Sequence, residues 1–268
     1  MTIIAITAEP GSQGAAVAAE LARRLNLSQA NAAVADYLRR KLDLPQAVID
    51  FLLDGKMPAQ TDENSHALSD PDLSLCVAAA VFGEAARGNV IIAMPCAAWL
   101  MQQVAQVLSV RLYAPRARRA KNLWAETGAT HSGTDALRHA ENQLRHEDDM
   151  RDHALRRLFG ANWDSPALYD LAIDTQVMSL PACADKIKAM TLLPQFAGSE
   201  PDRLKLANCH LMAQIRFALH GQGRSRETAP LRREAPLDDI VLGEENLIGL
   251  RQPRRNNAAF KTLKACHE

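Results

Sequence analysis

The chain of 268 residues contains no apolar run of the ~20 residues that a membrane-spanning helix requires. Its N-terminus enters a strand-like segment directly, without a basic stretch followed by a long apolar one, so we expect no signal peptide. The formal net charge is zero, and outside the C-terminal part lysine and arginine are spread along the sequence. These absences argue against a membrane protein and against a protein that binds nucleic acid.

The five cysteines lie far apart, are odd in number and include no Cys-x-x-Cys pair. This usage is typical of free thiols in a reducing cytoplasm, so we predict a cytoplasmic protein with neither a disulfide framework nor a metal site. There is also no Gly/Ser-rich linker, while 47% of the residues are hydrophobic. The chain can therefore bury a substantial core, either as one α/β domain with an extension or as two small domains.

Short aliphatic runs alternate with helical patterns over most of the sequence. The strand-like runs lie at 3–7, 90–94, 109–113 and 171–174. The helical patterns between them include 34–42, 46–53, 70–87 and 134–159, the last ending at Gly160. Such alternation predicts a parallel sheet covered by helices on both faces. Because ligands of these sheets bind at the carboxyl ends of the strands, we expect the site in the loops after Thr7, Met94 and Tyr113.

The segment after the first strand-like run has the layout of a phosphate-binding loop. Gly11 and Gly14 mark a tight turn, and Val17, Leu21 and Leu25 then recur on one face of a helix. A turn at a helix N-terminus presents free backbone N–H groups and roughly half a positive charge of helix dipole. The frame therefore predicts an anion cradle, although it also fits a plain strand-to-helix connection that binds nothing.

The reactive side chains of this kind of loop are missing. In the pattern G-x-x-x-x-G-K-[ST], counted from Gly14, the first glycine is Glu9, the lysine is Ala15 and the hydroxyl that binds Mg²⁺ is Ala16. We also expect the Glu9 carboxylate to repel an anion in the cradle.

Several blocks in order carry a resemblance to a known family. They are 6–25, Val110-Arg111-Leu112-Tyr113-Ala114-Pro115 with Arg119, Asp148-Asp149-Met150-Arg151, Phe159-Gly160-Ala161-Asn162-Trp163 and Tyr169-Asp170-Leu171. Over about residues 1–193 the chain thereby resembles the cytidylate kinase-like family of P-loop nucleoside monophosphate kinases. The resemblance implies a three-layer α/β P-loop kinase fold with a central parallel sheet over 1–193, followed by a helical and irregular extension over 194–268.

The resemblance also implies the ligands and the site. The nucleotides would be ATP and CMP or dCMP, used with Mg²⁺. Gly11, Ser12, Gln13 and Gly14 would wrap the donor phosphates. Arg119, Asp148 and Arg151 would belong to a lid over the transferred phosphoryl group, whose spread negative charge arginines stabilise.

The departures from the family pattern lie at the site. A family Arg is Ala8, a family Gly is Gln13, and an acidic residue is Asn31. A Gly-Arg-Gly turn is replaced by Ala93-Met94-Pro95. Because one lost charge-stabilising donor typically costs about 10²–10³ in turnover, these changes favour a degenerate relative that binds a nucleotide or a protein partner with weak or no phosphoryl transfer. The alternative is a working (d)CMP kinase in which Arg111, Arg116, Arg118 or Lys121 substitutes.

The last 75 residues differ in character. Ser199 opens a helix that we expect to run to about His220, with more apolar residues over 200–220 than one buried stripe requires. This helix packs on the kinase-like part or pairs with another subunit. We expect the remainder, 221–268, to be loosely structured.

Overall fold

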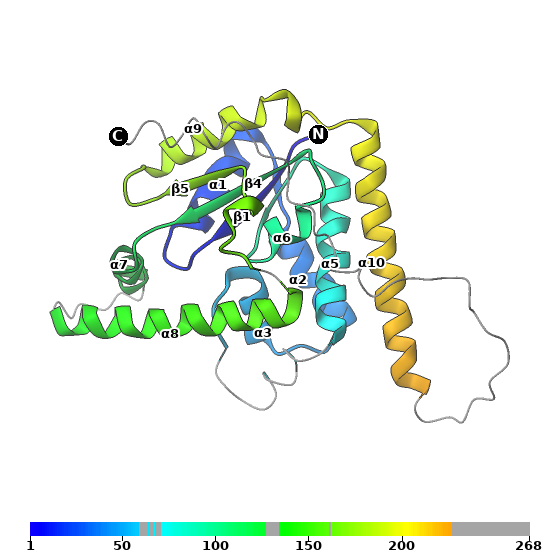
Figure 1. Ribbon diagram of the computed structural model, residues 1–268, viewed down its shortest axis with the longest axis horizontal. Helices are drawn as coiled ribbons and strands as arrows, with labels where there is room; N and C mark the ends of the chain where they lie inside the picture. The colour runs from blue at the N-terminus through cyan, green and yellow to red at the C-terminus, as the bar shows by residue number, and fades with distance from the viewer. Residues whose placement is uncertain (59–63, 65–66, 68–70, 127–133, 161, 227–268) are drawn as a thin grey trace.

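The computed structural model describes residues 1–268 except 59–63, 65–66, 68–70, 127–133, 161 and 227–268 (Figure 1). Its centre is a five-stranded parallel sheet in the order β2-β3-β1-β4-β5. The strands are β1 (Ile3–Ala8), β2 (Ser28–Gln29), β3 (Val90–Ala93), β4 (Val107–Tyr113) and β5 (Leu171–Asp174). All strands point the same way, so their carboxyl ends meet at one edge.

The helices cover both faces of the sheet. They are α1 (Gly14–Leu25), α2 (Asn31–Lys41), α3 (Gln46–Asp54), α5 (Pro71–Arg87), α6 (Ala97–Met101), α7 (Arg116–Glu126), α8 (Thr134–Phe159), α9 (Leu180–Thr191) and α10 (Glu200–Arg226). Two short 3₁₀ helices occupy Pro166–Leu168 and Pro194–Phe196.

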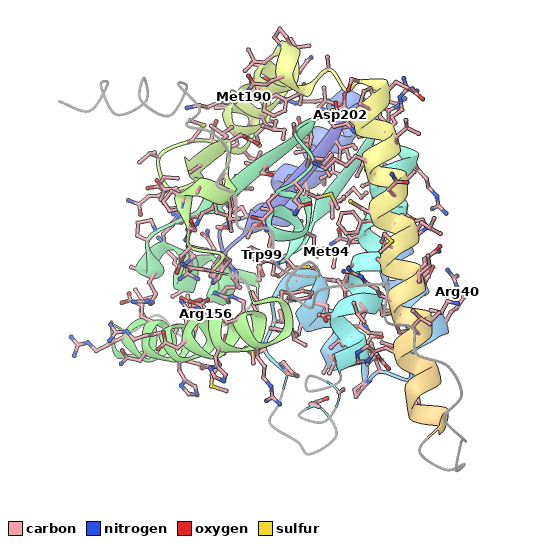
Figure 2. All side chains as sticks on the ribbon, turned by 45° about the vertical axis from the view of Figure 1, so that its right-hand side comes forward. Arg40, Met94, Trp99, Arg156, Met190 and Asp202 are labelled. Atoms are coloured by element: carbon pink, nitrogen blue, oxygen red, sulfur yellow. The ribbon has the colours of Figure 1, made fainter. Side chains whose placement is uncertain are left out.

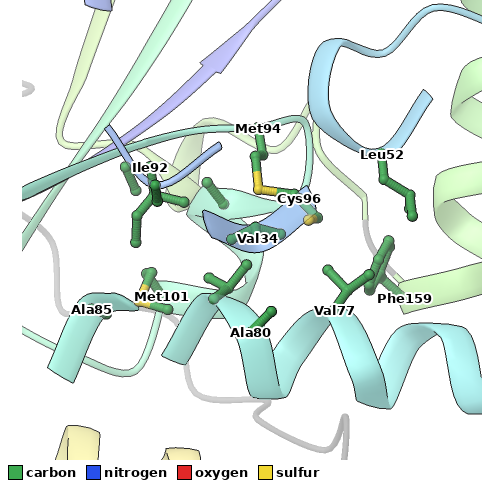
Figure 3. Close-up of a cluster of buried hydrophobic side chains, with 14 of the residues drawn as sticks. Val34, Leu52, Val77, Ala80, Ala85, Ile92, Met94, Cys96, Met101 and Phe159 are labelled. Atoms are coloured by element: carbon green, nitrogen blue, oxygen red, sulfur yellow. The ribbon is translucent and has the colours of Figure 1, made fainter. Parts of the chain in front are cut away.

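Alternate residues of the central strands β1, β3 and β4 pack into two separate cores. On one face Ile3 and Ile92 pack with side chains of α2, α3 and α5, as Figure 3 shows for part of the cluster. On the other face Ile4 and Ile91 pack with α1 and α9. Strands buried on both faces must be aliphatic throughout, which is why they were visible in the sequence as short apolar runs. The architecture is the predicted three-layer α/β sandwich.

The elements agree with the sequence prediction except at the edges. β5 and α8 have the predicted bounds, and Gly160 ends α8 in the left-handed conformation (φ 64°) with its N–H donating to the Arg156 carbonyl at 2.8 Å. The two-residue strand β2 carries no apolar pattern and was missed. The predicted helix start at Asp70 lies outside the described residues, and α5 ends before Gly88 as expected.

The C-terminal helix is longer than predicted. Ser199 caps it, since the Ser199 hydroxyl accepts from the Asp202 N–H at 3.3 Å and the Ser199 N–H donates to the Asp202 carboxylate at 3.1 Å. The prediction that it ends near His220 is wrong, because α10 continues to Arg226. A glycine such as Gly221 inside a helix costs only ~1 kcal/mol relative to alanine, so it does not by itself end the helix.

Helix α10 lies lengthwise against α5 (Figures 1 and 2). Leu206 is fully buried between them, His210 Nδ1 lies 2.9 Å from the Ala79 carbonyl oxygen, and His220 Nδ1 lies 3.0 Å from the Asp72 carboxylate. One of the two open alternatives, packing on the kinase-like part, is therefore realised. The boundary between 193 and 194 stays a prediction. Within the described ranges, every helix is too short or too polar to cross a membrane.

Candidate functional site

The loop between β1 and α1 is held in a conformation that needs its two glycines. Gly11 has φ 80°, and a Cβ there would lie 2.6 Å from the Arg119 carbonyl oxygen. A Cβ on Gly14 would lie 2.2 Å from the Ala8 Cβ, so α1 can start this close to β1 only with glycine. Gln13 is also left-handed (φ 62°), and its side chain is exposed. The Gln13 side chain therefore lies outside the turn and does not fill it.

Ser12 stabilises the loop from within. Its hydroxyl donates to the Glu9 carbonyl at 2.6 Å and lies 3.3 Å from the Leu112 carbonyl, and its N–H donates to the Glu9 carbonyl at 2.9 Å. The side chain is fully buried. Of the four residues predicted to wrap a phosphate, Ser12 thus uses its hydroxyl and its N–H in hydrogen bonds within the protein. The first N–H groups of α1, from Gly14 onward, have no partner within a helix and face the carboxyl edge of the sheet.

Glu9 lies between two arginines. Its Oε1 accepts from Arg111 Nη2 at 3.0 Å, and its Oε2 lies 3.1 Å from Arg119 Nε. The expectation that a bare Glu9 carboxylate repels an anion is corrected by this geometry, because two guanidinium groups neutralise it. Arg111 comes from β4 and Arg119 from α7, so Glu9 ties the loop to both neighbouring elements.

Arg119 is the most heavily committed side chain of the site. Its Nε donates to the Ala114 carbonyl at 3.2 Å and its Nη1 to the Pro10 carbonyl at 3.3 Å. The two terminal nitrogens also form a fork with the Asp148 carboxylate, at 3.1 Å and 2.5 Å. Its side chain is only 5% exposed. Arg119 therefore joins the loop, α7 and α8 in one contact.

Asp148 on α8 is the anion that brings together the arginines predicted to form a lid. Besides the Arg119 fork it accepts from Arg151 Nη2 at 2.6 Å, and Arg116 Nε lies 3.7 Å away. Burial of Asp148 opposes its ionisation, but the hydrogen bonds from Arg119 and Arg151 outweigh burial and lower its pKa. A carboxylate held this way is a poor base. The three predicted lid residues are thus brought together, with Asp148 positioning the two arginines.

An aromatic wall closes the outer side of this arrangement. The Arg111 guanidinium lies 5.1 Å from the Trp163 ring centre and 5.8 Å from that of Tyr169, and Arg151 lies 5.3 Å from Trp163. The Tyr169 hydroxyl donates to the Trp163 carbonyl at 2.6 Å. Arg111 also donates to the Asp164 carboxylate at 2.7 Å. Trp163 and Tyr169, which come from two of the sequence blocks that carry the resemblance, therefore support the arginines by packing against their guanidinium groups.

We call Glu9, Arg111, Arg116, Arg119, Asp148, Arg151 and Asp164 the arginine–carboxylate cluster. It holds four cations and three carboxylates. The sequence singled out Arg119, Asp148 and Arg151 but missed the central position of Glu9 and the contribution of Asp164. It also missed Asn122, whose Nδ2 donates to the Gly11 carbonyl at 2.7 Å. The available signal was the charge of Glu9 in the middle of an otherwise uncharged loop.

The remaining site positions are structural. Asn31, where the family has an acidic residue, donates to the Ala93 carbonyl at 2.9 Å. Met94, in place of the family arginine of that turn, is buried in the core. Ala15 and Ala16 at the start of α1 are exposed, as are Arg118 and Lys121 on α7. Cys96 is buried, which raises the pKa of its thiol to about 12 and makes it unreactive.

The residues present do not fit a protein-held magnesium ion. Ala16 stands where the loop pattern has its hydroxyl ligand, and the nearby Glu9 and Asp148 carboxylates are taken up by arginines. In the part of the chain that the structure describes, no group of three or more His, Cys, Asp or Glu side chains is placed to hold a metal. The site therefore has hydrogen-bond donors for an anion, namely backbone N–H groups and arginines, but few ligands for a cation.

Comparison with known proteins shows which sequences this chain is similar to. The chain is 29% identical over 192 residues to a cytidylate kinase of Ignicoccus hospitalis, covering 72% of this chain and the whole of that protein. It is 27% identical over 180 residues to a cytidylate kinase of Pyrobaculum islandicum, covering 67% of this chain and 87% of the relative.

Among solved structures, an uncharacterized protein from Eubacterium ventriosum covers 72% of this chain and all of its own, with a TM-score of 0.48 and 18% identity. A shikimate kinase from Acinetobacter baumannii in complex with shikimate covers 72% of this chain and 93% of its own, with a TM-score of 0.42 and 14% identity. The model of the cytidylate kinase-like family matches residues 3–177, which span the loop, the arginine–carboxylate cluster and all five strands. The chain belongs to the cytidylate kinase-like family.

Proposed function

We propose that this protein binds a nucleotide through the loop at Gly11–Gly14 and the neighbouring arginines, and that it transfers phosphoryl groups weakly or not at all. The observation that carries the proposal is the start of α1. The backbone frame of a phosphate-binding loop is intact there, while the two exposed positions that supply a lysine and a hydroxyl in the general pattern are Ala15 and Ala16.

The state of Arg119 supports the same proposal. An arginine that stabilises a phosphoryl-transfer transition state must offer donors to the migrating group. The Arg119 guanidinium instead donates to two carbonyls and a carboxylate of the protein itself. Its release would have to break a buried ion pair, which opposes catalysis more strongly than it opposes binding by the N–H groups of α1.

A second candidate is a working nucleoside monophosphate kinase that uses ATP and CMP or dCMP. The excess of cations in the arginine–carboxylate cluster favours it, since four arginines beside three carboxylates leave positive charge at the carboxyl edge of the sheet. The relatives named as cytidylate kinases make these nucleotides the first to test.

One pair of experiments separates the candidates. The purified chain is incubated with ATP, Mg²⁺ and each nucleoside monophosphate, and diphosphate formation is measured. In parallel its unfolding is followed with each nucleotide, because a ligand at 100 times its dissociation constant stabilises a protein by about 2.7 kcal/mol. We expect stabilisation with turnover far below the ~1–100 s⁻¹ of kinases.

Turnover in that range, abolished by Arg119→Ala, would establish the kinase instead. The absence of stabilisation by every nucleotide would refute binding itself.

A further inference from the structure

Helix α10 carries apolar side chains on two opposite faces. Leu206 and Ala213 are buried against the body of the protein, and Phe217 packs on the same core. About half a helical turn away lie side chains that are between 38% and 59% exposed, which we call the outer stripe: Leu204, Leu211, Met212, Ile215 and Leu219. A helix that only covers α5 needs the first face and has no use for the second.

The outer stripe has the composition of an interface centre. The sequence from Leu206 to Ile215 contains no Asp, Glu, Lys or Arg. Solvated helix faces carry charges, whereas the centres of protein interfaces are depleted in them. From Leu204 to Leu219 the stripe extends for fifteen residues, or ~22 Å along the helix axis. It is thus a continuous apolar ridge on the outside of the molecule, of the kind that marks an interaction surface.

A groove runs beside the stripe. A cavity of about 550 Å³ lies between α5, α6 and α10, with Phe82 and Trp99 on its walls. Leu204 and Met212 belong both to the stripe and to the lining of this groove. A second helix that packs on the stripe would therefore also cover the groove. The apolar side chains of that second helix could enter the groove.

Four of the five stripe members are placed symmetrically along the helix. About the midpoint between Leu211 and Met212, these two residues match each other and Leu204 matches Leu219. Ile215 has no apolar counterpart, because the matching position is the polar Asn208, which lies outside the stripe. A two-fold interface requires a surface that is complementary to its own reversed copy, and these four positions meet the requirement.

We propose that the outer stripe binds the same stripe of a second copy, with the two α10 helices antiparallel and the two-fold axis between Leu211 and Met212. With the axis there, Glu200 at the start of one helix lies level with Gly223 in the last part of the other, and opposite ends of the helix dipoles come together. A membrane surface is disfavoured as the occupant. An interfacial helix turns a polar, cationic face to water, and in α10 the face opposite the stripe is buried against α5.

Sedimentation of the full chain tests the proposal. We expect a dimer that Leu211→Glu dissociates, since two like charges then meet at the two-fold axis, with at least a hundredfold rise in the dissociation constant. Val177→Glu is the matched control, because Val177 is 79% exposed outside this helix, and it should remain a dimer. Circular dichroism and melting of each variant show that the exposed substitutions leave the fold intact.

A monomeric wild-type chain overturns the proposal. A dimer that survives Leu211→Glu also overturns it. The direction of the helices is tested by mixing Leu204→Cys chains with Leu219→Cys chains under oxidation, in a Cys209→Ser, Cys266→Ser background. Mixed disulfides support the antiparallel pair, and disulfides of each variant with itself refute it.

Discussion

Arg119 and Asp148 are joined by two parallel hydrogen bonds, Nη1 to Oδ1 at 3.1 Å and Nη2 to Oδ2 at 2.5 Å, in a setting where the side chains are only 5% and 13% exposed. This pair connects α7 to α8 and, through Arg119, both helices to the loop after β1. Because Arg151 donates to the same carboxylate, Asp148 is an acceptor that two buried cations share.

Asp148→Asn should therefore be strongly destabilising. The substitution keeps the shape but leaves Arg119 and Arg151 buried without their shared anion, and losing one partner of a buried ion pair costs about 3–5 kcal/mol. Urea unfolding measures the loss. The control is Asp185→Asn, which removes a 68%-exposed carboxylate from its pair with Arg24 and should cost less than ~1 kcal/mol. Equal small effects in both variants would show that Asp148 does not stabilise the contact between α7, α8 and the loop after β1.

The same carboxylate predicts a dependence of stability on pH. The pKa of Asp148 is lowered in the folded protein, so its ionised form is favoured by folding. Its stabilisation is complete above the ordinary pKa of 3.8 and is lost as the pH falls from there through the lower folded value. The difference in unfolding free energy between wild type and Asp148→Asn should hence be constant from pH 7 to pH 5 and shrink in more acid solution. A difference that grows on acidification would contradict the assignment.

Glu9→Gln should tighten the binding of an anion if the loop binds one. The change removes the carboxylate that neutralises Arg111 and Arg119, at 3.0 Å and 3.1 Å, and so frees their positive charge for a ligand. We expect the dissociation constant for ATP, measured by titration calorimetry, to fall about tenfold, which corresponds to ~1.4 kcal/mol. Glu20→Gln, a carboxylate of α1 that pairs with Arg23 and Arg24, is the control and should leave ATP affinity unchanged. Weaker binding by Glu9→Gln would mean that Glu9 aligns the arginines for the ligand.

Ala15→Lys and Ala16→Thr together should restore activity if the loop is a degenerate one. Both alanines are exposed at the start of α1, so the longer side chains meet no core. One preorganised donor is worth about 10²–10³ in turnover, and we expect at least a tenfold gain in diphosphate formation. Ala15→Met with Ala16→Val adds similar bulk without the charge and hydroxyl, and should give none. No gain from the Lys and Thr pair would place the obstacle in Arg119 and its partners instead.

Gly14→Ala should destabilise the chain by about 1–3 kcal/mol, because its new methyl group would lie 2.2 Å from the Ala8 Cβ. Ala8→Gly removes the opposing methyl group, and the double variant should recover most of the loss. Unfolding free energies of the four proteins form a cycle whose coupling energy isolates this contact. Additive losses would show that the close approach of β1 and α1 is not what requires glycine at this position.

Much of the scaffold could be predicted because its signals are local. β5 is a short run of neighbouring residues in which Leu171 and Ile173 are buried on one face, and α8 ends where Gly160 adopts a left-handed conformation. The turn at Gly11 and Gly14 was visible for the same reason. Local patterns failed where they were weak, as in the two residues of β2, and where one residue was read as a helix end, as at Gly221 inside α10.

The sequence by itself indicated the alternation of strands and helices apart from β2, the position of the loop, and the alanines at positions 15 and 16 where the general pattern has a lysine and a hydroxyl. Only the tertiary structure decided what the charged residues do. Glu9 and Arg111 are 102 residues apart in the chain, and Arg119 and Asp148 are 29 apart. Periodicity reports which face of an element is buried, but an ion pair depends on where two elements meet. The same reason explains why the sequence showed α10 to be unusually apolar, while the fold showed which of its two apolar faces is still open.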